Sequence, residues 1–114
     1  MIYIFSAFYA EAKNIIDHYG LKKEKSPEMV RFDVFANESI RLVITGVGEI
    51  NAAAAVSNIG GAYGISQDDE ILNVGCGAGF SSDICMGSIF LGNKLTEQMT
   101  GRTFYPDMLM KANF

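Results

Sequence analysis

The stretch that decides the fold is residues 2–19, IYIFSAFYAEAKNIIDHY. Residues 2–8 form an apolar run rich in β-branched and aromatic side chains, which predicts a buried strand. Residues 10–19 predict a helix, and Gly20 is a typical residue for its end. The apolar side chains that recur at helical spacing are Ala12, Ile15, Ile16 and Tyr19. The chain is therefore expected to open with a strand that leads directly into a helix.

The segments that follow continue the alternation of strands and helices. Apolar and polar side chains alternate around the turn at residues 37–39, which predicts a β-hairpin over residues 29–45 and a sheet that is not purely parallel. The other predicted elements are a charged loop over 21–28, a helix over 49–64, a turn and then a buried strand within 68–75, a glycine-rich loop over 76–88, a strand over 89–96 and an irregular tail. This order predicts an α/β fold, three-layer α/β/α with a mixed central sheet, in a single domain over residues 1–114.

Composition excludes several classes of function. The chain has 114 residues, of which 49% are hydrophobic, and this is enough for the core of one domain. The net charge of −4 and the absence of a basic patch argue against a nucleic-acid partner. Lys22, Lys23 and Lys25 are mixed with acidic residues and are expected in a solvated loop. No apolar stretch is long enough for a bilayer, and the start lacks a basic leader, so a cytoplasmic location without a membrane partner is expected.

The cysteines and the histidine of the chain do not form the pattern of a zinc site. Cys76 and Cys85 are expected to be free thiols, and neither has a Cys or His partner at metal-ligand spacing. The one histidine, His18, lies in the first predicted helix and is expected at its surface. The sequence therefore predicts no metal site and no cofactor.

Two glycine-rich loops follow predicted strands, where α/β proteins commonly build their binding sites. They are Gly46-Val47-Gly48 and residues 75–79, GCGAG. Loops without side chains let a flat ligand approach the backbone, although tight packing of strand against helix explains such loops equally well. Glu11, just beyond the first strand, has two explanations as well: a favourable charge at a helix start, or a general base that faces a ligand.

Three segments, in this order and spacing, resemble the methylthioadenosine/S-adenosylhomocysteine nucleosidases of the purine nucleoside phosphorylase superfamily. They are residues 5–16, FSAFYAEAKNII; residues 42–55, LVITGVGEINAAAA; and residues 71–80, ILNVGCGAGF, followed by MGSIFLGN. The resemblance covers most of residues 2–95 and implies a nucleoside phosphorylase-like fold of which this chain is the amino-terminal portion.

The resemblance implies cleavage of the N-glycosidic bond of a purine nucleoside through an oxocarbenium-like transition state, with one group assisting the base and another activating water. Glu11 falls where the family has its water-activating glutamate. Phe8 and Val47 would line the ribose and 5′ side, and Phe104 and Tyr105 would reach the 5′ pocket, in the same or a neighbouring subunit. The other implied substrate-binding residues are Ala7, Gly48, Cys76, Gly77 and Ala78.

The chain departs from the family in ways that bear on activity. The family's ribose-binding Met-Glu pair and purine-protonating Asp lie in its carboxy-terminal half, and nothing after residue 95 resembles them. Ser88 stands where an Asp is usual. The arginines, with which phosphorylases hold phosphate, all lie outside the glycine loops here, which favours the nucleosidase branch. The chain is accordingly expected to be truncated, nearly inactive alone, and either a homodimer or in need of a missing half.

Two alternatives stay open. ILNVGCGAGF resembles the first motif of S-adenosylmethionine-dependent methyltransferases, which requires a helix directly after the loop, so helical structure over residues 80–90 discriminates the two. The other alternative is a non-catalytic remnant or a small α/β module that dimerises through its apolar tail. The methionines that fit such an adaptable interface are Met86, Met99, Met108 and Met110.

Overall fold

The first strand of the chain, β1 (Ile2–Ser6), lies between two parallel neighbours in the computed structural model, which describes residues 1–106. These neighbours are β4 (Ile40–Ile44) and β5 (Glu70–Asn73). The chain forms two units, residues 1–77 and residues 78–114. Met108 and Met110, two of the methionines of the predicted interface, lie outside the described residues.

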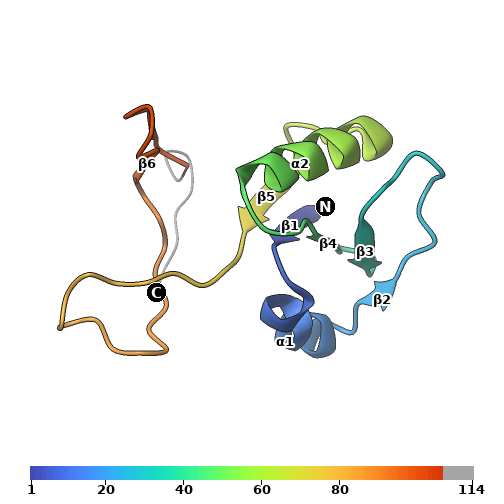
Figure 1. Ribbon diagram of the computed structural model, residues 1–114. Helices are drawn as coiled ribbons and strands as arrows, with labels where there is room; N and C mark the ends of the chain where they lie inside the picture. The colour runs from blue at the N-terminus through green and yellow to red at the C-terminus, as the bar shows by residue number, and fades with distance from the viewer. Residues whose placement is uncertain (107–114) are drawn as a thin grey trace. The chain divides into compact units, whose positions relative to one another are not determined.

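The sheet of the first unit has five strands in the order β2-β3-β4-β1-β5 (Figure 1). The antiparallel strands are β3 (Asp33–Ala36), which pairs with β4, and β2 (Lys22–Lys23), which pairs with β3. The predicted hairpin and mixed sheet are therefore confirmed. Lys22 and Lys23 were expected in a loop, and this was wrong, because their backbone pairs with Ala36 and Phe35.

Two helices accompany this sheet, α1 (Tyr9–Tyr19) and α2 (Glu49–Tyr63). Both end as the sequence predicted, at Gly20 with φ 63° and at Gly64 with φ 66°. This left-handed conformation is one that glycine adopts without a steric penalty. The first strand ends at Ser6 and not at residue 8, since Phe8 is already the residue that precedes α1.

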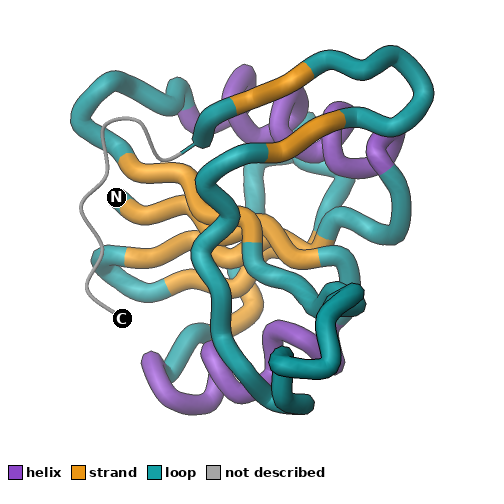
Figure 2. The backbone as a smooth tube through the Cα atoms, turned by 90° about the vertical axis from the view of Figure 1, so that its left-hand side faces the viewer, coloured by secondary structure: helices purple, strands orange, loops and turns teal. Residues whose placement is uncertain are grey.

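The core consists of two clusters on opposite faces of the sheet, because successive side chains of a strand point to opposite faces. Tyr3 and Phe5 of β1 belong to the cluster that includes Ala55 and Ile59 of α2. Ile4, between them, belongs to the cluster of α1. Figure 1 shows α2 above the sheet and α1 below it, and Figure 2 shows the strands between them as neighbouring orange segments. The remaining members of the α1 cluster are Ala12, Ile16, Leu21, Ile40 and Leu42.

A polar network closes the α2 side of the core. The hydroxyl of Tyr63 donates to Glu24 Oε2 at 2.6 Å, and Arg41 donates to the hydroxyl of Tyr3 at 3.1 Å. The Arg41 guanidinium lies 4.1 Å from the centre of the Tyr63 ring. Burial raises the pKa of Tyr63, and the hydrogen bond to Glu24 raises it further. The network ties the segment after β2 to β1, β4 and α2.

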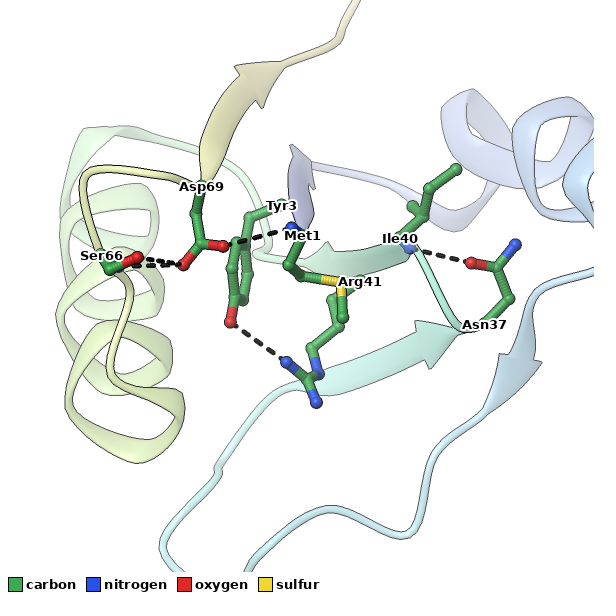
Figure 3. A network of polar contacts seen from close by, with 7 residues as sticks. All are labelled: Met1, Tyr3, Asn37, Ile40, Arg41, Ser66 and Asp69. Carbon is green, nitrogen blue, oxygen red and sulfur yellow. Dashed lines mark hydrogen bonds and ion pairs between the residues drawn. The ribbon is translucent and has the colours of Figure 1, made fainter.

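Asp69 joins the start of β5 to the start of β1 (Figure 3). Its carboxylate accepts the N–H of Ser66 at 2.9 Å and lies 3.2 Å from the ammonium group of Met1. The Ser66 hydrogen bond, and the Met1 charge in addition, lower the pKa of Asp69 from the ordinary 3.8. A lowered pKa stabilises the folded state above pH 3.8, and this contribution is lost as the pH falls through the folded-state value.

We therefore expect Asp69→Asn to lower the stability of the protein at neutral pH, with the difference from wild type shrinking below pH 3.8. Urea unfolding at a series of pH values measures this difference. Asp68→Asn, which removes the same charge from an exposed neighbour, is the matched control. A difference between wild type and Asp69→Asn that stays constant down to pH 2 would rule out this role.

The second unit contains a short antiparallel pair, β6 (Leu95–Thr96) and β7 (Thr103–Phe104). The strand predicted over residues 89–96 was wrong for all but its last two residues, and the predicted irregular tail contains β7. Ile89 and Phe90 lie exposed outside any strand. Residues 80–90 contain turns and bends and no helix.

Within residues 1–106, no helix is long and apolar enough to cross a membrane.

Candidate functional site

The carboxyl ends of β4, β1 and β5 lie side by side at one edge of the sheet, because the three strands are parallel. Backbone hydrogen bonds continue past the strand ends and hold the following residues together. Thr45 donates to Ser6 O at 2.8 Å, Gly46 to Ala7 O at 3.1 Å, and Val74 to Phe5 O at 3.0 Å. Both glycine-rich turns therefore begin at the same edge, one on each side of β1.

The carboxylate of Glu11 lies against the second of these turns. Its Oε2 accepts the backbone N–H of Cys76 at 2.7 Å. A Cβ added to Gly75 would lie 3.1 Å from the same oxygen, so this glycine leaves the space that the carboxylate occupies. Glu11 is in the first turn of α1, where a negative charge is also favoured by the helix dipole. The position of Glu11 at the start of α1 therefore gives its carboxylate both a favourable interaction with the helix dipole and a contact with the turn.

The first glycine turn is held by side chains on both sides of it. Gly46 and Gly48 have φ of 85° and 93°, a region that other residues rarely adopt. The buried Thr45 donates its hydroxyl to Gly46 O at 2.8 Å, and Asn51 of α2 donates its amide to Val47 O at 2.7 Å. Neither Thr45 nor Asn51 was predicted from the sequence. The available signal was a short polar side chain in the first turn of a helix, which commonly bonds to nearby backbone.

The other predicted residues of the first unit lie around these turns. Ala7 is half-buried, whereas Phe8 and Val47 are 51% and 60% exposed. The thiol of Cys76 is free, as was predicted, and it is exposed. The structure thus brings Ala7, Glu11, Gly48, Cys76 and Gly77 to one edge of the sheet.

Three predicted residues, Ala78, Phe104 and Tyr105, belong to the second unit. Phe104 pairs with Leu95 in the β6–β7 ladder, and the guanidinium of Arg102 lies 5.5 Å from the centre of its ring. Tyr105 follows β7 and is exposed. Their predicted part in a 5′ pocket stays a prediction.

Ser6 is the one fully buried polar side chain at the end of β1. Its hydroxyl has no hydrogen-bond partner among the described residues, and its side chain lies on the α1 face of the sheet. A buried hydroxyl without a partner costs stability. We assign it no role in the site.

A shallow hollow of about 390 Å³ lies away from the glycine turns, at β2 and the turn between β3 and β4. The turn between β3 and β4 precedes β4, so the hollow is at the opposite end of the strands. Exposed charged side chains and backbone line it, and it brings no catalytic group together. Its lining residues are Lys22, Lys23, Glu24, Ala36, Asn37 and Glu38.

Other side chains that could bind a metal or transfer a proton lie apart from one another. His18 is exposed, as was predicted, and its ring contacts that of Tyr19 with centroids 4.7 Å apart. Over the part of the chain that the structure describes, no three His, Cys, Asp or Glu side chains gather into a group that could hold a metal ion. The chemistry of the glycine-turn edge thus rests on the Glu11 carboxylate and the backbone around it.

Comparison with known proteins adds no assignment: no family model, no curated protein and no solved structure matches the chain.

Proposed function

We propose that residues 1–77 form the amino-terminal half of a purine nucleoside site of the nucleosidase type, with Glu11 as the group that activates water. The single observation that supports this proposal most is the hydrogen bond from Cys76 N–H to Glu11 Oε2 at 2.7 Å. It brings the carboxylate of the first helix against a turn without bulky side chains. The other glycine turn begins at the same sheet edge, and turns without side chains let a flat ligand approach the backbone.

The carboxylate has the chemistry that this role requires. Oε2 is held by Cys76 N–H, and among the described residues Oε1 has no hydrogen-bond partner. A carboxylate with one oxygen held and the other open can accept a proton from a water molecule that attacks the sugar. Because Oε2 is fixed, the direction of Oε1 is restricted. The N–H of Cys76 thus orients the Glu11 carboxylate that would act as the general base.

The proposed activity belongs to a larger site than the one formed by this chain. By resemblance, the group that protonates the purine and the residues that bind the ribose come from segments with no counterpart here. Absence of a general acid alone costs about 10²–10⁴ in rate. We therefore propose that the chain binds a nucleoside weakly and turns it over very slowly, and that a second copy or a missing half completes the site.

The fold supports the same proposal. α1 and α2 contribute to core clusters on opposite faces of the mixed sheet, which is consistent with a three-layer α/β/α arrangement. The strand β5 pairs on one side only, with β1, among the described residues. Its Ile71 is half exposed. An open edge of this kind is where a longer nucleoside phosphorylase-like sheet would continue.

The methyltransferase alternative is disfavoured by the segment after the second turn. That motif requires a helix directly after the glycine loop, and residues 80–90 contain only turns and bends. The residue at the end of β5 is Asn73, where the methyltransferase motif expects an acidic residue.

A non-catalytic module remains the second candidate, and two observations favour it. The bond of Glu11 to Cys76 stabilises the turn whether or not a ligand binds. In addition, large apolar side chains of the second unit are exposed, as in a surface that another molecule covers. The most exposed of them are Phe80, Met86, Ile89 and Met99. This candidate predicts self-association without affinity for nucleosides, and light scattering tests the self-association.

Titration calorimetry with adenosine and methylthioadenosine tests the proposed function. We expect measurable binding by wild type and an affinity about tenfold lower for Glu11→Gln, because hydrogen bonds to charged groups contribute roughly 1.5–3 kcal/mol. Glu49→Gln is the matched control, since Glu49 is the acidic residue in the first turn of the other helix and is exposed. It should bind like wild type.

Release of adenine is measured in the same samples. Turnover near the enzymatic range of about 1–10³ s⁻¹ that is abolished in Glu11→Gln would contradict the proposal that a second copy or a missing half must complete the site. No binding by wild type at millimolar nucleoside would refute the proposed function and favour the non-catalytic module.

A further inference from the structure

Asn51 makes the contact that holds the first glycine turn in place. It lies in the first turn of α2, and its side-chain amide donates to Val47 O, four residues earlier, at 2.7 Å. The residue before α2, Gly48, caps the helix without any side-chain hydrogen bond. Among the described residues, Asn51 therefore supplies the only side-chain bond from α2 to this turn.

The same side chain lies close to the other glycine of the turn. A Cβ added to Gly46 would meet Asn51 Nδ2 at 3.2 Å and Cγ at 3.4 Å. Gly46 has φ of 85°, so both its conformation and its surroundings exclude a larger residue. Asn51 thus packs on one residue of the turn and bonds to the next.

The contacts of this turn decide which of its backbone groups are free to bind a ligand. All three carbonyls of the turn are engaged: Gly46 O by the side chain of Thr45, Val47 O by the side chain of Asn51, and Gly48 O by the backbone N–H of Ala52. No hydrogen bond within residues 1–106 engages the N–H of Val47 or of Gly48. Because the carbonyls are held, the turn keeps its two donors free for the acceptor atoms of a ligand.

We propose that Asn51 is a positioning residue of the nucleoside site, which acts through the backbone of Val47 and Gly48. The proposal rests on the proposed function, because it takes the glycine turns as the surface that the nucleoside contacts. Asn51 does not take part in the reaction. It fixes the conformation in which the turn offers its N–H groups to the sugar or base.

The test separates the hydrogen bond from the packing of Asn51. Asn51→Asp keeps the size of the side chain but has no donor for Val47 O. A negative charge in the first turn of a helix is favourable, so α2 itself should not lose stability. We expect an unchanged melting temperature, altered amide resonances at residues 46–48, and an affinity for adenosine about fivefold lower. Asn93→Asp, the same change at an exposed position outside both helices, should alter none of the three.

The outcomes are distinct. A melting temperature and an affinity that fall together would make Asn51 a structural residue only and would overturn the proposal, as would a variant that binds adenosine like wild type. If wild type binds no nucleoside, the proposed function fails. The amide resonances then still decide the assignment of Asn51, since unmoved resonances at residues 46–48 in Asn51→Asp would refute it.

Discussion

Replacement of Leu42 by alanine is expected to lower the free energy of unfolding by about 2–5 kcal/mol. Leu42 lies on β4, which pairs with β3 on one side and β1 on the other, and its side chain is fully buried. It belongs to the cluster that joins α1 to the sheet. The substitution leaves a cavity between α1 and the sheet, so this loss is the largest that we predict for a single side chain.

Urea unfolding followed by circular dichroism measures this loss. Ile50→Ala is the matched control, since Ile50 is 82% exposed on α2 and alanine favours a helix. Its effect should be within about 0.5 kcal/mol of zero. Equal losses for the two variants would show that α1 does not pack on Leu42 in solution.

Replacement of Gly75 by alanine is expected to displace the carboxylate of Glu11. The new Cβ would lie 3.1 Å from Oε2, so the carboxylate must move by a few tenths of an ångström, which lengthens its hydrogen bond to the N–H of Cys76. We expect a loss of about 1–2 kcal/mol in stability and an affinity for adenosine about tenfold lower, because a charge-assisted hydrogen bond is weakened.

The same turn offers its own control. Gly77 has no positive φ, and a Cβ added to it would meet nothing within 4 Å. Gly77→Ala therefore makes the same chemical change two residues away without touching Glu11, and it should keep the stability of wild type. If urea unfolding gave the same values for the two alanine variants, the close approach of Glu11 to Gly75 would be refuted.

Much of the first unit could be predicted from local patterns. The strand–helix start, the hairpin, the glycine that ends each helix and the alanine-rich α2 all follow from spacing and from residues with strong conformational preferences. The misplaced elements depend on partners far along the chain. The charged pair Lys22-Lys23 is a strand only because β3 lies beside it, and residues 89–94 have the composition of a strand but no such neighbour among the described residues.

The sequence predicted which residues lie in the candidate site, but it did not predict the hydrogen bonds that they form. That two turns after parallel strands meet at one sheet edge follows from topology, and the sequence already placed Glu11 at the start of the helix beside them. The bond of Glu11 to Cys76 N–H joins residues 65 positions apart, and the bond of Asn51 depends on the exact path of the turn. Neither contact has a periodic pattern that a sequence can show.

The central claim, that the carboxylate of Glu11 is held at the second glycine turn, is tested most directly by hydrogen exchange at the amide of Cys76. Our account predicts a protected amide in wild type and exchange at least about tenfold faster in Glu11→Ala, with the β1 amides unchanged in both. An amide of Cys76 that exchanges at the same rate in the two proteins would contradict it.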